Sequence, residues 1–136
     1  MAALSVNGIG ATVDSESTFK FAAANGTGKI YPGGTGSSDL KGWVYFAIPS
    51  PLPPYSALNS VTIQFAATNA QVDKVAVWLG NNQVFSADNL QQTDTFTKPI
   101  ASSQAVYNGS GIAVAVYVVF DGPASKVNFQ SVSIGV

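Results

Sequence analysis

Apolar and polar residues alternate along most of this chain with a period of two. Val61, Ile63 and Phe65 lie in one phase of segment 61–68, and polar or small residues lie in the other. Segment 112–120 carries the longest apolar face of this kind. Because successive side chains of a β-strand point to opposite faces, this period predicts strands that each bury one face.

Turn-forming residues separate the alternating segments. Asn25-Gly26 and Asp121-Gly122 are typical of tight turns, because asparagine, aspartate and glycine tolerate the backbone angles that such turns require. A phase slip at Gln130-Ser131 predicts a β-bulge within the last strand. The strands predicted from these patterns cover residues 4–7, 11–13, 18–22, 29–31, 43–48, 61–68, 74–79, 112–120 and 127–136.

A helix has little support anywhere in the chain. No long segment carries the apolar stripe at i, i+3 and i+4 that a helix would show, and Ser86 to Leu90 could form at most a single turn. Residues 25–39 are rich in glycine, threonine and serine and are interpreted as one long loop. We therefore predict an all-β fold, an antiparallel β-sandwich that is jelly-roll-like and has about eight to ten strands. An up-and-down barrel is the alternative, and the uneven lengths of the strands count against it.

The length of the chain predicts a single β-sandwich domain that covers residues 1–136. A chain of 136 residues has no room for two hydrophobic cores. Apolar residues make up 46% of it, which is enough for a core that needs neither disulfides nor a metal ion.

The chain contains no histidine, no cysteine and no arginine. Histidine is the usual general base near neutral pH, and cysteine is the most nucleophilic side chain. Zinc sites built from nitrogen and sulfur ligands are also excluded. We therefore predict that the protein is not an enzyme, that it has no catalytic residues, and that it holds no cofactor and no tightly bound metal.

The charged residues indicate neither a nucleic-acid partner nor a membrane span. The formal net charge is −1, and the six basic residues, all lysines, are scattered rather than clustered into the basic stripe that nucleic-acid binding requires. No window approaches the length of apolar sequence that a transmembrane helix needs.

The compartment is not fixed by the sequence. The first residues show neither the basic segment nor the apolar run of a signal peptide. Only 10% of the residues are charged, which is unusual for the crowded cytosol, where like charges keep proteins apart. We expect an extracellular or cell-surface location rather than a cytoplasmic one.

Besides capping turns, the carboxylates could serve two chemical roles, as a catalytic pair or as calcium ligands. A glycosidase needs two carboxylates on either side of the bond to be cleaved, and spacing in the sequence does not exclude that. Asp88-Asn89 and Asp94 could contribute to a weak calcium site, although no Asp-x-Asp-x-Asp-Gly loop is present. The ordinary reading, which we favour, is that the aspartates cap turns.

Aromatic residues lie in the phase opposite to the aliphatic ones in three of the predicted strands. Trp43, Tyr45, Trp78 and Tyr117 would then occupy the outer faces if the aliphatic faces point into the sandwich. Long loops such as residues 25–39 or 49–58 could fold over these rings. Otherwise the rings form an exposed patch, which in a soluble protein usually marks a binding or association surface.

Two functions would use such a patch. In the first, the aromatic rings and nearby amides form a shallow platform for carbohydrate or another surface ligand, since flat rings stack on sugars and amides bind their hydroxyls. In the second, the chain is a self-assembling structural subunit, a homo-oligomer or filament that packs through apolar faces and strand edges. The candidate ligand-binding residues are Trp43, Tyr45, Trp78, Asn81, Asn82, Tyr107, Asn108 and Tyr117.

Segment 42–51 resembles the signature of a known family. It reads Gly-Trp-Val-Tyr-Phe-Ala-Ile-Pro-Ser-Pro, and it is similar to the Trp-Phe-His-Phe-Ala-Ile-Pro-Thr-Pro segment of a small bacterial β-sandwich family of unknown function. The likeness continues through residues 5–8, 12–14, 75–80 and 111–114. Asn7 and Tyr45 stand where the family has histidines. The resemblance implies a β-sandwich and implies no particular activity.

Overall fold

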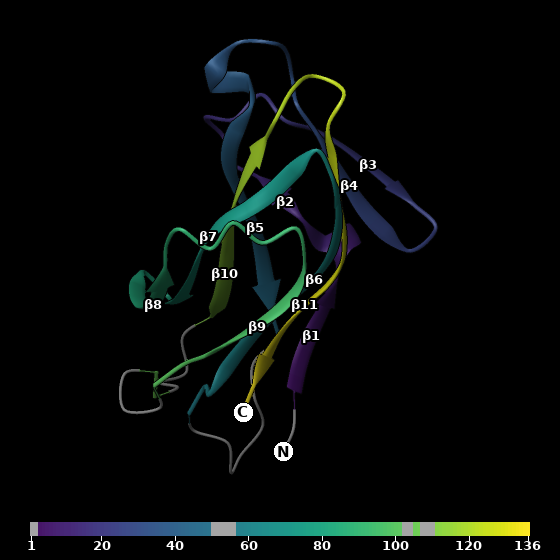
Figure 1. The fold of residues 1–136 in the computed structure, drawn as a ribbon. Coiled ribbons are helices and arrows are strands. Elements are labelled where there is room, and N and C mark those ends of the chain that lie inside the picture. The colour runs from purple at the N-terminus through teal and green to yellow at the C-terminus, as the bar shows by residue number, and fades with distance from the viewer. Residues whose placement is uncertain (1–2, 50–56, 102–104, 107–110) are drawn as a thin grey trace.

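The computed structural model describes residues 3–49, 57–101, 105–106 and 111–136, and it shows two β-sheets packed face to face (Figure 1). Two short 3-10 turns, η1 (Gly8–Gly10) and η2 (Ser37–Asp39), accompany the strands. The strands are β1 (Ala3–Asn7), β2 (Thr12–Val13), β3 (Lys20–Ala24), β4 (Thr27–Tyr31), β5 (Lys41–Ile48), β6 (Ser60–Thr68), β7 (Ala70–Leu79), β8 (Asn82–Ala87), β9 (Asp94–Pro99), β10 (Ile112–Phe120) and β11 (Lys126–Gly135).

The arrangement of the strands confirms the predicted antiparallel β-sandwich. The first sheet has the order β3-β4-β11-β6-β9, with β1 also paired to β11, and the second has the order β2-β5-β10-β7-β8. Every pairing is antiparallel. The strands therefore form two separate sheets rather than one closed barrel. Within the described residues there are eleven strands, one more than the upper end of the predicted range.

Two details of the sequence-based prediction are wrong, the single loop at residues 25–39 and the absence of two strands. Residues 25–39 are not one loop: the predicted strand 29–31 is confirmed as part of β4 (Thr27–Tyr31), and the predicted turn Asn25-Gly26 joins β3 to β4, with φ of 54° and 75°. Strands β8 and β9 were not predicted. Residues 86–90 form no helical turn, as expected from the weak helical pattern, and Ser86 and Ala87 end β8.

The predicted bulge in the last strand is confirmed. The register of β11 against β6 shifts between Phe129 and Ser131, which leaves Gln130 as the extra residue. Phe129 and Val132 are both fully buried, although they lie in opposite phases of the sequence. The bulge therefore lets both halves of β11 bury their apolar side chains.

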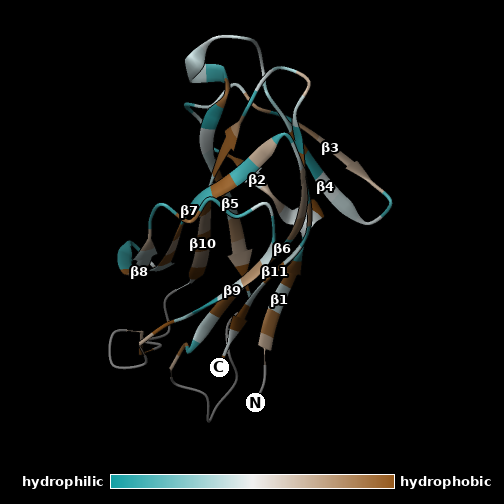
Figure 2. Cartoon of the chain, in the orientation of Figure 1, coloured by the Kyte–Doolittle hydropathy of each residue, from teal (hydrophilic) through white to brown (hydrophobic). Residues whose placement is uncertain are grey.

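The core lies between the sheets and centres on three phenylalanines. Phe46 of β5 in the second sheet packs against Phe129 of β11 in the first, with ring centroids 5.1 Å apart, and Phe65 of β6 lies 6.2 Å from Phe129. The colours of Figure 2 alternate along strands such as β1, as expected for strands with one buried face. Within the described part of the chain, no helix is long and apolar enough to cross a membrane.

Gly8 is buried at a close approach of η1 to the first sheet. A Cβ atom at Gly8 would overlap the backbone carbonyl of Phe129, and one at Gly28 would overlap the carbonyl of Gly8. We expect Gly8→Ala to lower the free energy of unfolding by about 2 kcal/mol or more, because backbone must shift to admit the methyl group. Denaturant unfolding measures this. Gly122→Ala is the control, since no atom lies within 4 Å of its Cβ position, and equal stability of the two variants would contradict the expectation.

Candidate functional site

Four of the predicted site residues share the outer face of the second sheet. In β5, Val44 and Phe46 are fully buried, so Trp43 and Tyr45 point away from the core. Tyr117 of β10 lies opposite Trp43, and Trp78 of β7 lies opposite Ala113 of β10. The alternation of these strands therefore gathers Trp43, Tyr45, Trp78 and Tyr117 on one surface.

This surface carries a depression of about 200 Å³, which we call the aromatic depression. Ala76 and Ala115 form its floor; they lie opposite each other on β7 and β10, and only 4% and 2% of their surface is exposed. No lining side chain carries a charge. The depression is lined by Trp43, Tyr45, Ala76, Trp78, Gln83 and Ala115.

Tyr117 supports Trp43 from behind rather than lining the aromatic depression. The two rings pack edge to face with centroids 5.1 Å apart. The Nζ atom of Lys74 lies over the ring of Tyr117, 4.9 Å from its centroid, which is within the range of a cation–π contact. Trp43 of β5 therefore packs against Tyr117 of β10, which in turn contacts Lys74 of β7.

A second, smaller depression lies on the other side of Trp43. It has a volume of about 160 Å³, and we call it the charged depression because charged side chains line it. Its lining consists of Asp14, Glu16, Ser17, Lys41, Gly42, Trp43 and Tyr117. Trp43 therefore forms the ridge between a neutral depression and a charged one.

Tyr45 links the two depressions through a hydrogen bond. Its hydroxyl donates to Oδ2 of Asp14 over 3.4 Å, while Oδ1 of Asp14 accepts the backbone N–H of Glu16 over 2.9 Å. Burial, and then the negative charge of Asp14, raises the pKa of Tyr45 above its ordinary value. The hydrogen bond to Asp14 orients the Tyr45 ring at the wall of the aromatic depression.

Two β-bulges place polar residues beside the aromatic rings. Across β7 and β8, Val77 lies opposite Phe85 and Trp78 lies opposite Gln83, so Val84 is the extra residue. Without this bulge, the alternation would put the ring of Phe85 beside Ala76 on the outer face. With it, Ser86 lies there instead, and the floor of the depression stays open.

The second bulge lies at the other end of β7. Tyr117 lies opposite Lys74 but Val118 lies opposite Val72, so Asp73 is the extra residue. The bulge keeps Val72 in the core and still brings Lys74 to the outer face, where its Nζ atom lies over the ring of Tyr117. Sequence reasoning identified neither Lys74 nor Gln83 as part of the site.

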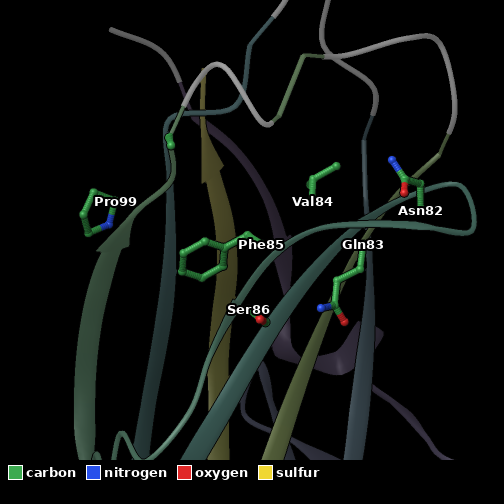
Figure 3. Close-up of a pocket in the computed structure, with 7 residues that line it drawn as sticks. Asn82, Gln83, Val84, Phe85, Ser86 and Pro99 are labelled. Carbon is green, nitrogen blue, oxygen red and sulfur yellow. The ribbon is translucent and has the colours of Figure 1, made fainter.

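The two predicted turn asparagines lie away from the aromatic depression. Asn81 is in the turn between β7 and β8, and Asn82 begins β8 opposite Leu79. Asn82 lines a larger opening of about 680 Å³ between the edge strands β8 and β9, where the ring of Phe85 points towards Pro99 (Figure 3). Tyr107 and Asn108 lie outside the described residues.

The predicted loop cover is not found in the part of the chain that the structure describes. All six residues that line the aromatic depression belong to strands of the sheet itself. Residues 27–31 pair in the other sheet, so this part of segment 25–39 does not fold over the rings. Tyr45 is 37% exposed. Most of segment 49–58 lies outside the described residues.

Two of the acidic residues, Asp14 and Asp39, accept backbone N–H groups in turns, as expected from the sequence. Asp14 accepts the N–H of Glu16, and Asp39 accepts the N–H of Gly36 over 3.2 Å. Among the described residues, no three acidic side chains lie close enough to share a metal ion. The homo-oligomer and the self-assembling subunit stay predictions.

No family model and no curated protein matches the sequence. Among solved structures, the chain is similar to the C-terminal CBM6 module of a marine laminarinase from Zobellia galactanivorans, with a TM-score of 0.55, 11% identity, and coverage of 99% of this chain and 100% of that one. It is also similar to the low-affinity xylan-binding module CBM86 from Roseburia intestinalis, with a TM-score of 0.54, 16% identity, and coverage of 99% and 96%.

An enzyme shares the same fold. A cyclase from Fischerella sp. TAU aligns with a TM-score of 0.52 and 14% identity, over 90% of this chain and 71% of that one. The resemblance noted in segment 42–51 is accompanied by no family match. The chain therefore has the two-sheet β-sandwich fold of carbohydrate-binding modules, a fold that cyclases also use, and no sequence family is identified for it.

Proposed function

We propose that this chain is a non-enzymatic carbohydrate-binding module and that the aromatic depression is its binding site. The observation that carries the proposal is the depression itself, in which Trp43, Tyr45 and Trp78 stand around a floor of alanines. Flat aromatic rings stack on the apolar faces of sugar rings, and a few polar groups at the rim bind hydroxyls. The fold shared with two carbohydrate-binding modules supports the same conclusion.

The chemistry of the lining favours binding over catalysis. The six lining residues include no carboxylate, and Asp14, the acid nearest to Tyr45, is engaged by a hydroxyl and a backbone N–H. A hydrolase would need two carboxylates flanking the bond that breaks. The depression therefore offers stacking and hydrogen bonding without an acid–base pair.

Affinity electrophoresis in gels that contain neutral and anionic polysaccharides tests the proposal. We expect at least one neutral polysaccharide to retard the wild-type protein, and Trp78→Ala to weaken binding about tenfold, because losing one stacked ring costs about 1.4 kcal/mol. Phe21→Ala is the matched control, since Phe21 is an aromatic residue of the other sheet with 40% exposure. A wild-type protein that no glycan retards, and that binds no oligosaccharide at millimolar concentration, would refute the function.

A further inference from the structure

The two tryptophans of the aromatic depression are far apart along the sheet. Trp43 lies opposite Tyr117 on β10, and Trp78 lies opposite Ala113 on the other side of β10. The two residues are thus separated by two strand spacings and by four residues along β10, which places their Cα atoms roughly 16 Å apart. This span exceeds the length of a single sugar ring.

The side chains that lie between the two tryptophans are mostly small. A row of side chains crosses four strands in register, with Tyr45 opposite Ala115, Ala115 opposite Ala76, and Ala76 opposite Ser86. The bulge at Val84 is what puts Ser86 rather than Phe85 in this row. The side chains of Ala115 and Ala76 are short, so the surface between the two tryptophans is low, and we call this strip the low path. The larger side chain of Tyr45 lies at one end of the row.

The charges around the path favour an uncharged ligand. The lining is neutral, and the ammonium of Lys74 is placed over the Tyr117 ring rather than in the depression. Asp14 and Glu16 lie in the charged depression just beyond Trp43. An anionic chain that continued past Trp43 would meet these carboxylates, and like charges at close range repel.

We propose that the aromatic depression binds an internal stretch of a neutral glycan chain, with one sugar stacked on Trp43, another on Trp78, and the chain crossing Ala76 and Ala115 between them. Gln83 is the specificity-determining residue, because its carboxamide, next to Trp78, can accept from and donate to sugar hydroxyls. This inference rests on the proposed function and adds to it the length and the charge of the ligand.

Titration calorimetry with oligosaccharides of increasing length tests the span. The probes are gluco- and xylo-oligosaccharides with β-linkages, together with oligogalacturonates as the anionic series. We expect the affinity for the neutral series to rise from the monosaccharide to the trisaccharide by more than about tenfold, and Trp78→Ala to remove most of that gain. Oligogalacturonates are expected to bind more weakly than neutral chains of equal length.

The outcomes separate this inference from the proposed function. If none of the probes and no polysaccharide binds, the proposed function fails. If a neutral sugar binds but the monosaccharide binds as tightly as the trisaccharide, or if the anionic series binds best, the function stands and the inference is wrong.

Substitutions at the floor and at the rim test the path directly. Ala115→Leu fills the low path while its side chain points away from the core, so we expect about tenfold weaker trisaccharide binding by a folded protein. Ala66→Leu, at an exposed position of β6 in the other sheet, is the control. Gln83→Leu keeps the volume but removes the amide, so about fivefold weaker binding is expected, with reduced discrimination between epimers. Wild-type trisaccharide affinity in Ala115→Leu would overturn the inference.

Discussion

The variant that carries both Trp43→Ala and Trp78→Ala is expected to lose glycan binding by about a hundredfold while keeping its fold. Losing both stacked rings costs about 2.8 kcal/mol in total, which is a hundredfold change in the dissociation constant. Both tryptophans are partly buried on the outer face of the second sheet, and neither belongs to the core between the sheets. Titration calorimetry of the neutral trisaccharide, with a thermal melt of each variant, measures the two effects separately.

The paired control replaces two aromatic residues of the other sheet. Phe21 and Tyr31 lie in the β3–β4 hairpin, and both are at least partly exposed. Phe21→Ala combined with Tyr31→Ala should leave glycan affinity unchanged. If the double tryptophan variant binds within about threefold of the wild type, the binding site lies elsewhere, and the opening between β8 and β9 becomes the next place to examine.

Trp43 and Trp78 are not expected to contribute equally. Trp43 packs edge to face against Tyr117, and the Nζ atom of Lys74 lies over the Tyr117 ring. A ring that is already held in its bound orientation loses less conformational entropy when a ligand stacks on it. The two single substitutions should therefore differ, with the larger loss of affinity at Trp43.

The aromatic face could be predicted from the sequence because it depends only on local alternation. Once Val44 and Phe46 are assigned to the core, Trp43 and Tyr45 must point outwards. The same reasoning placed Trp78 and Tyr117. These assignments need no knowledge of which strands are neighbours, and all four residues lie together in the structure.

The floor and the polar rim could not be predicted in this way, because they depend on pairing between distant segments. Ala76 and Ala115 are unremarkable in the sequence, and they become a floor only because β7 pairs with β10 in that register. Gln83 had one usable signal, since a two-residue turn at Gly80-Asn81 aligns it with Trp78. Strand β8 was missed because the bulge at Val84 breaks its alternation.

Strand β9 was missed for a different reason. Among the described residues it is an edge strand of the first sheet, paired only with β6, and four of its six residues are exposed. Phe96 is its only aromatic or aliphatic side chain apart from Pro99. An edge strand with so little buried surface has almost no hydrophobic pattern by which to recognise it.

Phe129→Ala is expected to lower the free energy of unfolding by about 4 kcal/mol, because it removes a fully buried ring from the centre of the core. Phe129 contacts Phe46 in the opposite sheet and Phe65 in its own, so the loss would open a cavity between the two sheets. A domain of this size is typically stable by about 5–15 kcal/mol, so the effect would be a large part of the total. Urea unfolding followed by tryptophan fluorescence measures it.

The same variant separates stability from binding. Phe129 points into the sandwich, whereas the aromatic depression lies on the outer face of the second sheet, so the folded fraction of Phe129→Ala should bind the neutral trisaccharide with wild-type affinity. Phe21→Ala, which removes a ring with 40% exposure, should cost less than about 1 kcal/mol of stability. A stability loss at Phe129 no larger than at Phe21 would contradict the packing described for the core. A loss of affinity in the folded protein would mean that the outer face depends on the packing between the sheets, and not only on the alternation within β5, β7 and β10.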